Sequence, residues 1–317
     1  MKQKMNSWLT RPKKDGKPLN RNLKDNIEYY LLMAIPLILI FIFSYLPMGG
    51  LVIAFQDYSA GRPFFGEGVK WVGLKHFKRF VGSYYFGRIL KNTLVLNVLS
   101  LLLGFWVPIV FALVVNEIRN AKFRKFTQTV SYMPNFISAV VVGGMFLSFI
   151  ASDGILTHLF QKMGFEAKSL NANKEFFPWF YTFLHIWKSF GWSSIIYLST
   201  ITSIDPALYE SAELDGCSRL KKIWYITLPN MLPLIMIQLI FTVGNMLTSN
   251  SEMILLLYNP SIYETADVIG TYNHREGLMG GQYSYGTACG LLLSVMSFAL
   301  VWIANAIARK KTDYSIW

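Results

Sequence analysis

The chain has 317 residues, of which 53% are hydrophobic and 16% aromatic, and its mean hydropathy is +0.36. Only 15% of its residues are charged, against roughly 25% in typical soluble domains, and these charges fall mainly between apolar runs. This composition excludes an ordinary soluble domain of this size and predicts a protein of the lipid bilayer.

The formal net charge of +12 raises the question of nucleic acid, because basic patches bind phosphates. Here the basic residues gather at the ends of apolar segments, where they set membrane orientation, so no nucleic-acid partner is expected. The cysteines, Cys217 and Cys289, fall in segments expected at different depths, and the four histidines are isolated in sequence. The sequence therefore predicts neither a disulfide framework nor a metal site.

Residues 1–28 form a basic, polar N-terminal segment, and apolar character begins only near Tyr29. A secretory signal would begin its apolar core sooner and end at a small-residue cleavage site. The run from Leu31 to Phe55 also exceeds a signal core of about 7–15 residues. We therefore expect a retained first membrane span.

Six apolar segments are long enough to cross a hydrocarbon core, which takes about 20 residues. They cover approximately Tyr29–Phe55, Ile89–Val115, Phe126–Ile150, Phe176–Ile201, Met231–Leu247 and Gly286–Ala308. Long apolar runs without strict alternation favour helices over the strands of a closed barrel. The sequence predicts an all-α integral membrane protein whose six transmembrane helices occupy residues 29–308, followed by a tail at 309–317.

Four basic stretches indicate the orientation: the N-terminal segment, the link after the second span, a polar segment after the fourth span, and the tail. In a six-span chain all four lie on one side, so the positive-inside rule predicts that both termini and the polar segment are cytoplasmic. The loop from Asp57 to Arg88 is also basic and lies on the other side, but its length lowers its weight.

The fourth span contains Lys188, Trp192 and Tyr197. An ionisable residue within a span is a functional candidate, so Lys188 is a candidate for a substrate pathway, and Trp192 and Tyr197 of the same span are further candidates. The alternative for Lys188 is snorkelling toward an interface or a hydrogen bond to a neighbouring carbonyl. The alternative for Trp192 and Tyr197 is packing or an interfacial belt.

The polar segment 205–229 is the most sharply punctuated part of the chain. Asp205 and Pro206 suit the N-cap and first residue of a helix, and Gly216 can end that helix in the left-handed conformation. A second short helix can then run toward Pro229. We expect a helix-turn-helix that faces water, called the knob (residues 205–229) below.

Within the knob, Glu210-Ser211-Ala212 is followed after three residues by Gly216 and after nine more by Ile226-Thr227-Leu228-Pro229. This pattern resembles the EAA loop (E-A-A, three residues, G, nine residues, I-x-L-P) in permease subunits of binding-protein-dependent ABC importers. Every anchor matches in type and spacing except Ser211, which replaces alanine at the second position of the family pattern. The resemblance implies the type I ABC importer permease fold and a loop that docks on a cytoplasmic ATPase subunit. The implied coupling residues are Glu210, Ser211, Ala212, Asp215, Gly216, Ile226, Leu228 and Pro229.

The same resemblance implies a multi-pass protein of the bacterial inner membrane. Its implied partners are a second homologous permease subunit, two ATP-binding cassette subunits and an extracellular solute-binding protein. No G-x-x-x-x-G-K-[ST] loop occurs in the chain, so ATP and Mg are expected on the partner ATPases and no cofactor on this chain. We therefore expect a permease that is not itself an enzyme.

Downstream of the fifth span, residues 252–260 and 263–272 resemble the LplB-type oligosaccharide and polysaccharide branch of these permeases, which implies a saccharide substrate. Glu252, Asn259, Asp267 and Tyr272 are candidates for the pathway, because sugars need hydrogen bonds to hydroxyls and flat faces to stack against. The alternative for each is an outer loop that folds over the bundle or touches the binding protein.

A different class of function, the ion-coupled secondary transporter, is the main alternative. Such proteins need membrane-buried acidic or ion-coordinating groups. Asp and Glu here are confined to loops and span ends.

Overall fold

The structure is a computed structural model that describes residues 27–164, 170–247, 251–311 and 315. Most of the predicted N-terminal segment and part of the tail lie outside the described residues. The described part is helical and contains no β-strand, and one isolated bridge pairs Gln56 with Trp71. The all-α architecture predicted from hydropathy is thus confirmed. The chain divides into two compact units, residues 1–52 and 53–317.

The first unit is one helical run made of α2 (Ile27–Ile40), η2 (Phe41–Tyr45), α3 (Leu46–Met48) and the start of η3 (Gly49–Phe55). Pro36 lies inside α2 and Pro47 inside α3 without ending the run. Residues Tyr29–Phe55 are long and apolar enough to cross a membrane, in agreement with the predicted first span.

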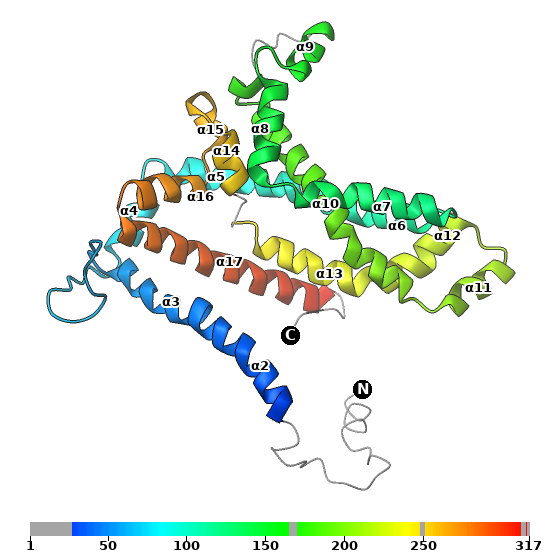
Figure 1. The fold of residues 1–317 in the computed structure, drawn as a ribbon, viewed down its shortest axis with the longest axis horizontal. Helices are drawn as coiled ribbons and strands as arrows, with labels where there is room; N and C mark the ends of the chain where they lie inside the picture. The colour runs from blue at the N-terminus through cyan, green and yellow to red at the C-terminus, as the bar shows by residue number, and fades with distance from the viewer. Residues whose placement is uncertain (1–26, 165–169, 248–250, 312–314, 316–317) are drawn as a thin grey trace. The chain divides into compact units, whose positions relative to one another are not determined.

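The second unit contains the other helices (Figure 1). Up to residue 172 these are α4 (Lys75–Val81), α5 (Phe86–Leu99), η4 (Ser100–Gly104), α6 (Trp106–Asn116), α7 (Ala121–Phe136), α8 (Ala139–Ile150), α9 (Ile155–Lys162) and η5 (Leu170–Ala172). There follow α10 (Phe177–Thr202), α11 (Pro206–Leu214), α12 (Arg219–Lys222), η6 (Ile223–Thr227), α13 (Leu228–Gly244), α14 (Ser251–Leu257), η7 (Pro260–Ile262), α15 (Tyr263–Ala266), α16 (Ile269–Asn273), η8 (His274–Met279) and α17 (Tyr283–Lys311).

Four helical runs of this unit are long and apolar enough to cross a membrane: Phe86–Asn116, Ala139–Lys162, Arg219–Gly244 and Tyr283–Lys310. The helix α10 is not among them, although its 26 residues cover the predicted fourth span except Phe176, which is the N-cap. With the run of the first unit, the described residues thus contain five strongly apolar candidates and one long, less apolar helix.

The prediction of a single helix over the third span, Phe126–Ile150, is wrong. The helix α7 ends at Phe136, Ile137 is extended with a ψ of 133°, and Ser138 starts α8 as its N-cap. The Ser138 hydroxyl accepts a hydrogen bond from the Val141 N–H at 3.3 Å. Hydropathy does not register such a cap, because Phe136, Ile137 and the residues of α8 that adjoin the break are apolar. The break lets α7 pack along α10 while α8 packs against α14.

The second helix of the knob and the fifth span also differ from expectation, because they form one run from Arg219 to Gly244. Pro229 has no N–H to donate to the carbonyl one turn back, which would normally weaken the helix. The π-helical turn η6 precedes it, with the Leu228 N–H bonded to the Ile223 carbonyl. Pro229 therefore lies inside a continuous helix and does not mark a joint.

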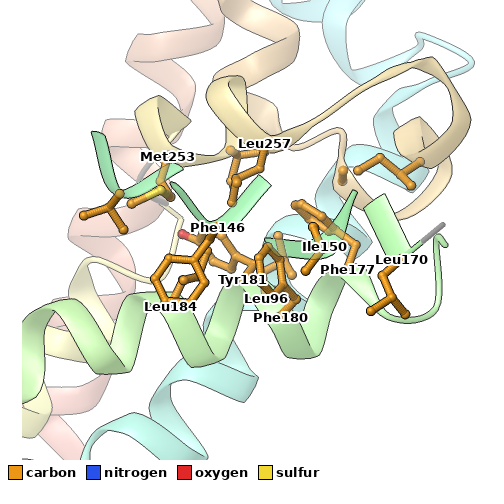
Figure 2. Packing of buried hydrophobic residues seen from close by; sticks show 14 of the residues in the cluster. Leu96, Phe146, Ile150, Leu170, Phe177, Phe180, Tyr181, Leu184, Met253 and Leu257 are labelled. Atoms are coloured by element: carbon orange, nitrogen blue, oxygen red, sulfur yellow. The ribbon is translucent and has the colours of Figure 1, made fainter. Parts of the chain in front are cut away.

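The long helix α10 organises the packing of the second unit. Its first half packs against α8 and α14 in a buried cluster that includes Phe146, Phe180 and Leu257 (Figure 2). Its second half packs against α6 and α13 around Ile109 and Met231. One helix thus joins two buried apolar clusters.

The crossing of α7 over α10 depends on Gly191. A Cβ at this position would collide with the backbone carbonyl of Ser131. Small residues allow such close approach of helices in membranes, where packing and not the hydrophobic effect drives association. One turn later, Ser194 is fully buried and its hydroxyl donates to the Gly191 carbonyl at 2.5 Å.

We expect Gly191→Ala to lower the free energy of unfolding by about 1–3 kcal/mol, because the methyl group forces α7 away from α10. Thermal unfolding of the full-length chain in detergent measures this change. The matched control is Gly144→Ala in the middle of α8, where a Cβ meets no atom within 4 Å. Equal melting temperatures for Gly191→Ala and the unsubstituted chain would contradict the close contact.

Candidate functional site

The first helix of the knob, α11, is capped at both ends as the sequence predicts. The Asp205 carboxylate accepts a hydrogen bond from the Ala207 N–H at 2.9 Å. At the other end Gly216 has a φ of +71° and donates its N–H to the Glu213 carbonyl at 3.0 Å. The Cys217 N–H reaches the Ala212 carbonyl at 2.9 Å, which completes a Schellman motif. The left-handed position explains why glycine occupies residue 216.

Two side-chain contacts fix α11 against the following helix. The Lys222 ammonium donates to the Glu213 carboxylate at 2.5 Å, and this hydrogen bond holds the pKa of Glu213 below its usual value. The Tyr209 and Thr227 hydroxyls are 2.9 Å apart, and Thr227 is buried. The knob is thus a defined hairpin of helices (Figure 1).

The predicted coupling residues lie together on the knob. Glu210, Ser211, Asp215, Gly216 and Pro229 are exposed, whereas Ala212, Ile226 and Leu228 are half-buried. The Ser211 hydroxyl donates to the Ala207 carbonyl of its own helix at 2.8 Å, so the serine fits where the pattern has alanine.

The motif did not point to the apolar side chains that the knob exposes. Leu214 is 91% exposed, Leu220 70%, Trp224 67% and Tyr225 79%. Large apolar groups exposed on an otherwise charged hairpin indicate a surface that another molecule covers. The signal in the sequence was the presence of Leu214 and Leu220 at positions that the pattern leaves open.

A groove of about 470 Å³ lies within the second unit. Its walls are the helical run from α5 through η4 to α6, the helix α10, and the helix α13 with the residues that follow it. Its polar lining consists of Asn97, Ser100, Tyr181, His185, Ser189, Ser193, Tyr197, Gln238, Thr242 and Asn245. No Asp, Glu, Lys or Arg of the described residues lines it. Amides, hydroxyls and aromatic faces of this kind can donate, accept and stack without selecting an ion.

One face of α10 supplies half of that polar lining. Tyr181, His185, Ser189, Ser193 and Tyr197 recur at every fourth residue and therefore lie on one side of the helix. The rings of Tyr181 and His185 stack at a centroid distance of 6.2 Å. This stripe was readable in the sequence as a polar periodicity of four within an apolar segment, but only Tyr197 was singled out.

The other candidates of the fourth span do not line the groove. The Lys188 ammonium donates to the Asn135 carbonyl in the last turn of α7 at 3.0 Å, which is the carbonyl alternative left open by the sequence. Trp192 is 49% exposed and packs edge-to-face on Phe136 at 5.4 Å. Of the three candidates, the structure places only Tyr197 in the groove.

Asp267 lies outside the groove and is fully buried among charged partners. The Arg275 guanidinium binds both of its carboxylate oxygens, at 3.1 and 2.8 Å, and the Thr271 hydroxyl donates at 2.8 Å. Arg88 approaches to 3.9 Å. The hydrogen bonds with Asp267 raise the pKa of Arg275. These contacts occupy the carboxylate within the chain.

The remaining outer-loop candidates also have partners or lie elsewhere. Asn259 caps η7 through the Ser261 N–H at 3.0 Å and donates its amide to the Asn171 carbonyl at 2.8 Å. The buried Tyr272 hydroxyl is 3.0 Å from that of Tyr285. Glu252 is exposed on α14. None of these residues lines the groove, and a substrate role for each stays a prediction.

Comparison with known proteins gives one family match. The family described as binding-protein-dependent transport system inner membrane component matches residues 104–313. This range begins beside the groove, at Gly104, and contains the whole knob.

Two proteins of Bacillus subtilis (strain 168) are similar over most of their length. The polygalacturonan/rhamnogalacturonan transport system permease protein YteP is 42% identical over 293 residues, which cover 92% of this chain and 90% of that protein. Protein LplB is 37% identical over 289 residues, which cover 91% and 90%.

Two solved structures have the same fold. One is a bacterial ABC transporter involved in the import of the acidic polysaccharide alginate, with a TM-score of 0.81, 40% identity, and coverage of 92% of this chain and 98% of that chain. The other is a bacterial alginate ABC transporter in complex with an alginate pentasaccharide-bound periplasmic protein. It gives a TM-score of 0.83 and 38% identity, with coverage of 95% and 100%.

We expect Asp267→Asn to lower the free energy of unfolding by about 2–3 kcal/mol, because it removes the carboxylate that binds both terminal guanidinium nitrogens of Arg275 and leaves Glu276, at 3.6 Å, as the remaining ion-pair partner among the described residues. Thermal unfolding of the full-length chain without any substrate measures this. The control is Glu252→Gln, an exposed carboxylate on the neighbouring α14, which should unfold at the unsubstituted temperature. An unaltered melting temperature for Asp267→Asn would instead favour a direct substrate contact.

Proposed function

Because this chain belongs to the family of binding-protein-dependent transport system inner membrane components, we propose that it is the permease subunit of an ATP-driven importer of oligosaccharides or polysaccharides. The observation that carries the saccharide assignment is the uncharged groove with its stripe of hydroxyl, imidazole and aromatic groups on α10. Sugars present hydroxyls and flat faces that such a lining can bind. The polygalacturonan and alginate named for similar proteins support this class.

The groove then forms this chain's half of the translocation pathway, and a second homologous permease supplies the other half. Tyr197 is the residue of the predicted pathway set that lines it. Lys188 and Asp267 act in packing, through the Asn135 carbonyl and Arg275 respectively.

The knob is the element that docks on an ATPase subunit. Its capping and the Glu213–Lys222 ion pair hold Glu210, Ala212 and Gly216 in one hairpin, with Leu214 projecting from it. ATP and Mg bind to two partner ATPase subunits, whose movement the knob transmits through the continuous helix from Arg219 into α13. An extracellular solute-binding protein delivers the saccharide. The similar alginate transporter in complex with a pentasaccharide-bound periplasmic protein supports this role.

The chain crosses a bacterial inner membrane six times, with residues 29–308 as the permease domain and residues 1–28 and 309–317 as cytoplasmic ends. The helix α7 runs antiparallel to α10, since Ser131 meets Gly191 and Asn135 meets Lys188. The third crossing is therefore α7 followed by α8. Basic residues in the knob and in the link before α7 favour the cytoplasmic side for both.

Replacing Leu214 by Asp tests the docking role. Leu214 is 91% exposed, so the chain should fold normally, but an apolar contact with the ATPase subunit is lost. We expect saccharide-stimulated ATP hydrolysis by the reconstituted complex to fall at least about tenfold, since burying a leucine stabilises by roughly 1.5–3 kcal/mol.

The control for this variant is Leu278→Asp, an exposed leucine of η8. It should keep full stimulation.

Transport of saccharide that persists without ATP would contradict the importer assignment and favour an ion-coupled transporter.

Replacing Tyr197 by Phe tests the groove, because it removes one hydroxyl and keeps the ring. We expect the saccharide concentration for half-maximal ATPase stimulation to rise about twofold to tenfold, the effect of one lost hydrogen bond. Oligogalacturonides and alginate oligosaccharides, each presented on its binding protein, are the probes. Trp192→Phe, outside the groove, should leave that concentration unaltered, and equal shifts in the two variants would count against the groove as the pathway.

A further inference from the structure

A second hollow, of about 390 Å³, opens between α7 and the C-terminal half of α10. It shares no lining residue with the groove. Its polar lining comes from Asn116, Arg124, Gln128, Tyr132, Ser199 and Thr202, and we call it the α7–α10 pocket. No carboxylate of the described residues lines it.

The charge of the α7–α10 pocket is not neutralised by the described part of the chain. Arg124 is exposed and takes part in none of the ion pairs or side-chain hydrogen bonds among those residues, and neither does the Gln128 amide. Lys122 and Lys125 adjoin Arg124 in sequence, with Glu117 as the nearest carboxylate along the chain. A guanidinium beside amides and hydroxyls is the donor set that binds a phosphate oxygen.

An apolar seam continues the pocket along the two helices. On α10, Ile195 lies one helical turn before Ser199 and Trp192 lies one turn before Ile195. Their side chains are 37% and 49% exposed. On α7, Phe136 lies one turn beyond Tyr132 and is 72% exposed. The Phe136 and Trp192 rings contact each other, which joins the two sides. The surface is therefore basic and polar at one end and apolar at the other.

We propose that the α7–α10 pocket binds the phosphate of an anionic phospholipid, with an acyl chain along the seam of Ile195, Trp192 and Phe136. A free phosphate would use the basic end and leave the apolar seam bare. Thr202 lies three residues before Asp205, so the pocket is on the knob's side of the membrane. That side is cytoplasmic under the proposed function, on which the assignment to that leaflet rests, and anionic lipids there attract basic segments.

A headgroup at this position would bridge α7 to the end of α10 that leads into the knob. Arg124 belongs to the first turns of α7, and Ser199 and Thr202 belong to the last turn of α10. The Arg124 charge therefore serves lipid binding, a role separate from the groove.

The test counts lipids on the purified complete complex by native mass spectrometry. The complex is equilibrated in detergent with equal concentrations of dioleoyl phosphatidylglycerol and dioleoyl phosphatidylcholine. We expect the unsubstituted complex to retain the anionic lipid in preference, Arg124→Gln to retain about fivefold less of it, and Arg124→Lys to lie between them. Lys122→Gln is the matched control, because it removes the same charge from the same turn without touching the pocket.

The seam is tested by Trp192→Ala, which should also lower retention of phosphatidylglycerol although it removes no charge. Thermal unfolding of each variant shows that it remains folded, as the exposure of Arg124 and Trp192 leads us to expect.

Four results would overturn the proposal. They are equal retention by the Arg124→Gln and unsubstituted complexes, equal loss in Arg124→Gln and Lys122→Gln, displacement of the lipid by excess inorganic phosphate, and cross-linking of Gln128→Cys to a partner subunit. The third would indicate a free-phosphate site and the fourth a protein contact. Saccharide-stimulated ATP hydrolysis, measured in parallel, reports on the proposed function alone, so the two can fail separately.

Discussion

The hydrocarbon core of a bilayer offers no hydrogen bonds, and every polar group placed there must find its partner within the protein. This constraint explains how the chain treats its prolines. The π-helical turns η4 and η6 precede Pro108 and Pro229 by a few residues, and each changes the hydrogen-bond pattern without breaking the helix. Long helices can therefore contain proline and still run continuously.

Polar side chains follow the same constraint. The Lys188 ammonium donates to the carbonyl of Asn135. This carbonyl belongs to the last turn of α7, where no N–H of the same helix is left to bond it. The buried Asn92 amide donates to the carbonyls of Glu264 and Asp267, both at 2.9 Å. Asp267 in turn is paired with Arg275. Several residues whose polarity suggests function when only the sequence is known thus hold the helices in place.

What is left after these internal bonds is the polar surface available to other molecules. The groove retains the α10 stripe from Tyr181 to Tyr197, and the α7–α10 pocket retains Arg124 and Gln128. The two surfaces differ in charge, since one has no ionised side chain among the described residues and the other has a guanidinium. They also use different faces of α10, so one helix contributes both to the groove proposed as the pathway and to the pocket proposed to bind lipid.

The sequence by itself determined the helical class, the caps of the knob, and the helices over five of the six predicted spans, all except the third. These features depend on local chemistry: hydropathy over about 20 residues, a carboxylate before Pro206, and a glycine where φ is positive. The break at Ile137 and Ser138 is also local, but the apolar residues around it conceal the cap. Which of Lys188, Tyr197 and Asp267 lines the groove was decided only by the tertiary structure. Each of these residues can bond within the chain or to a ligand, and the choice depends on which neighbouring helix brings a partner within hydrogen-bonding distance.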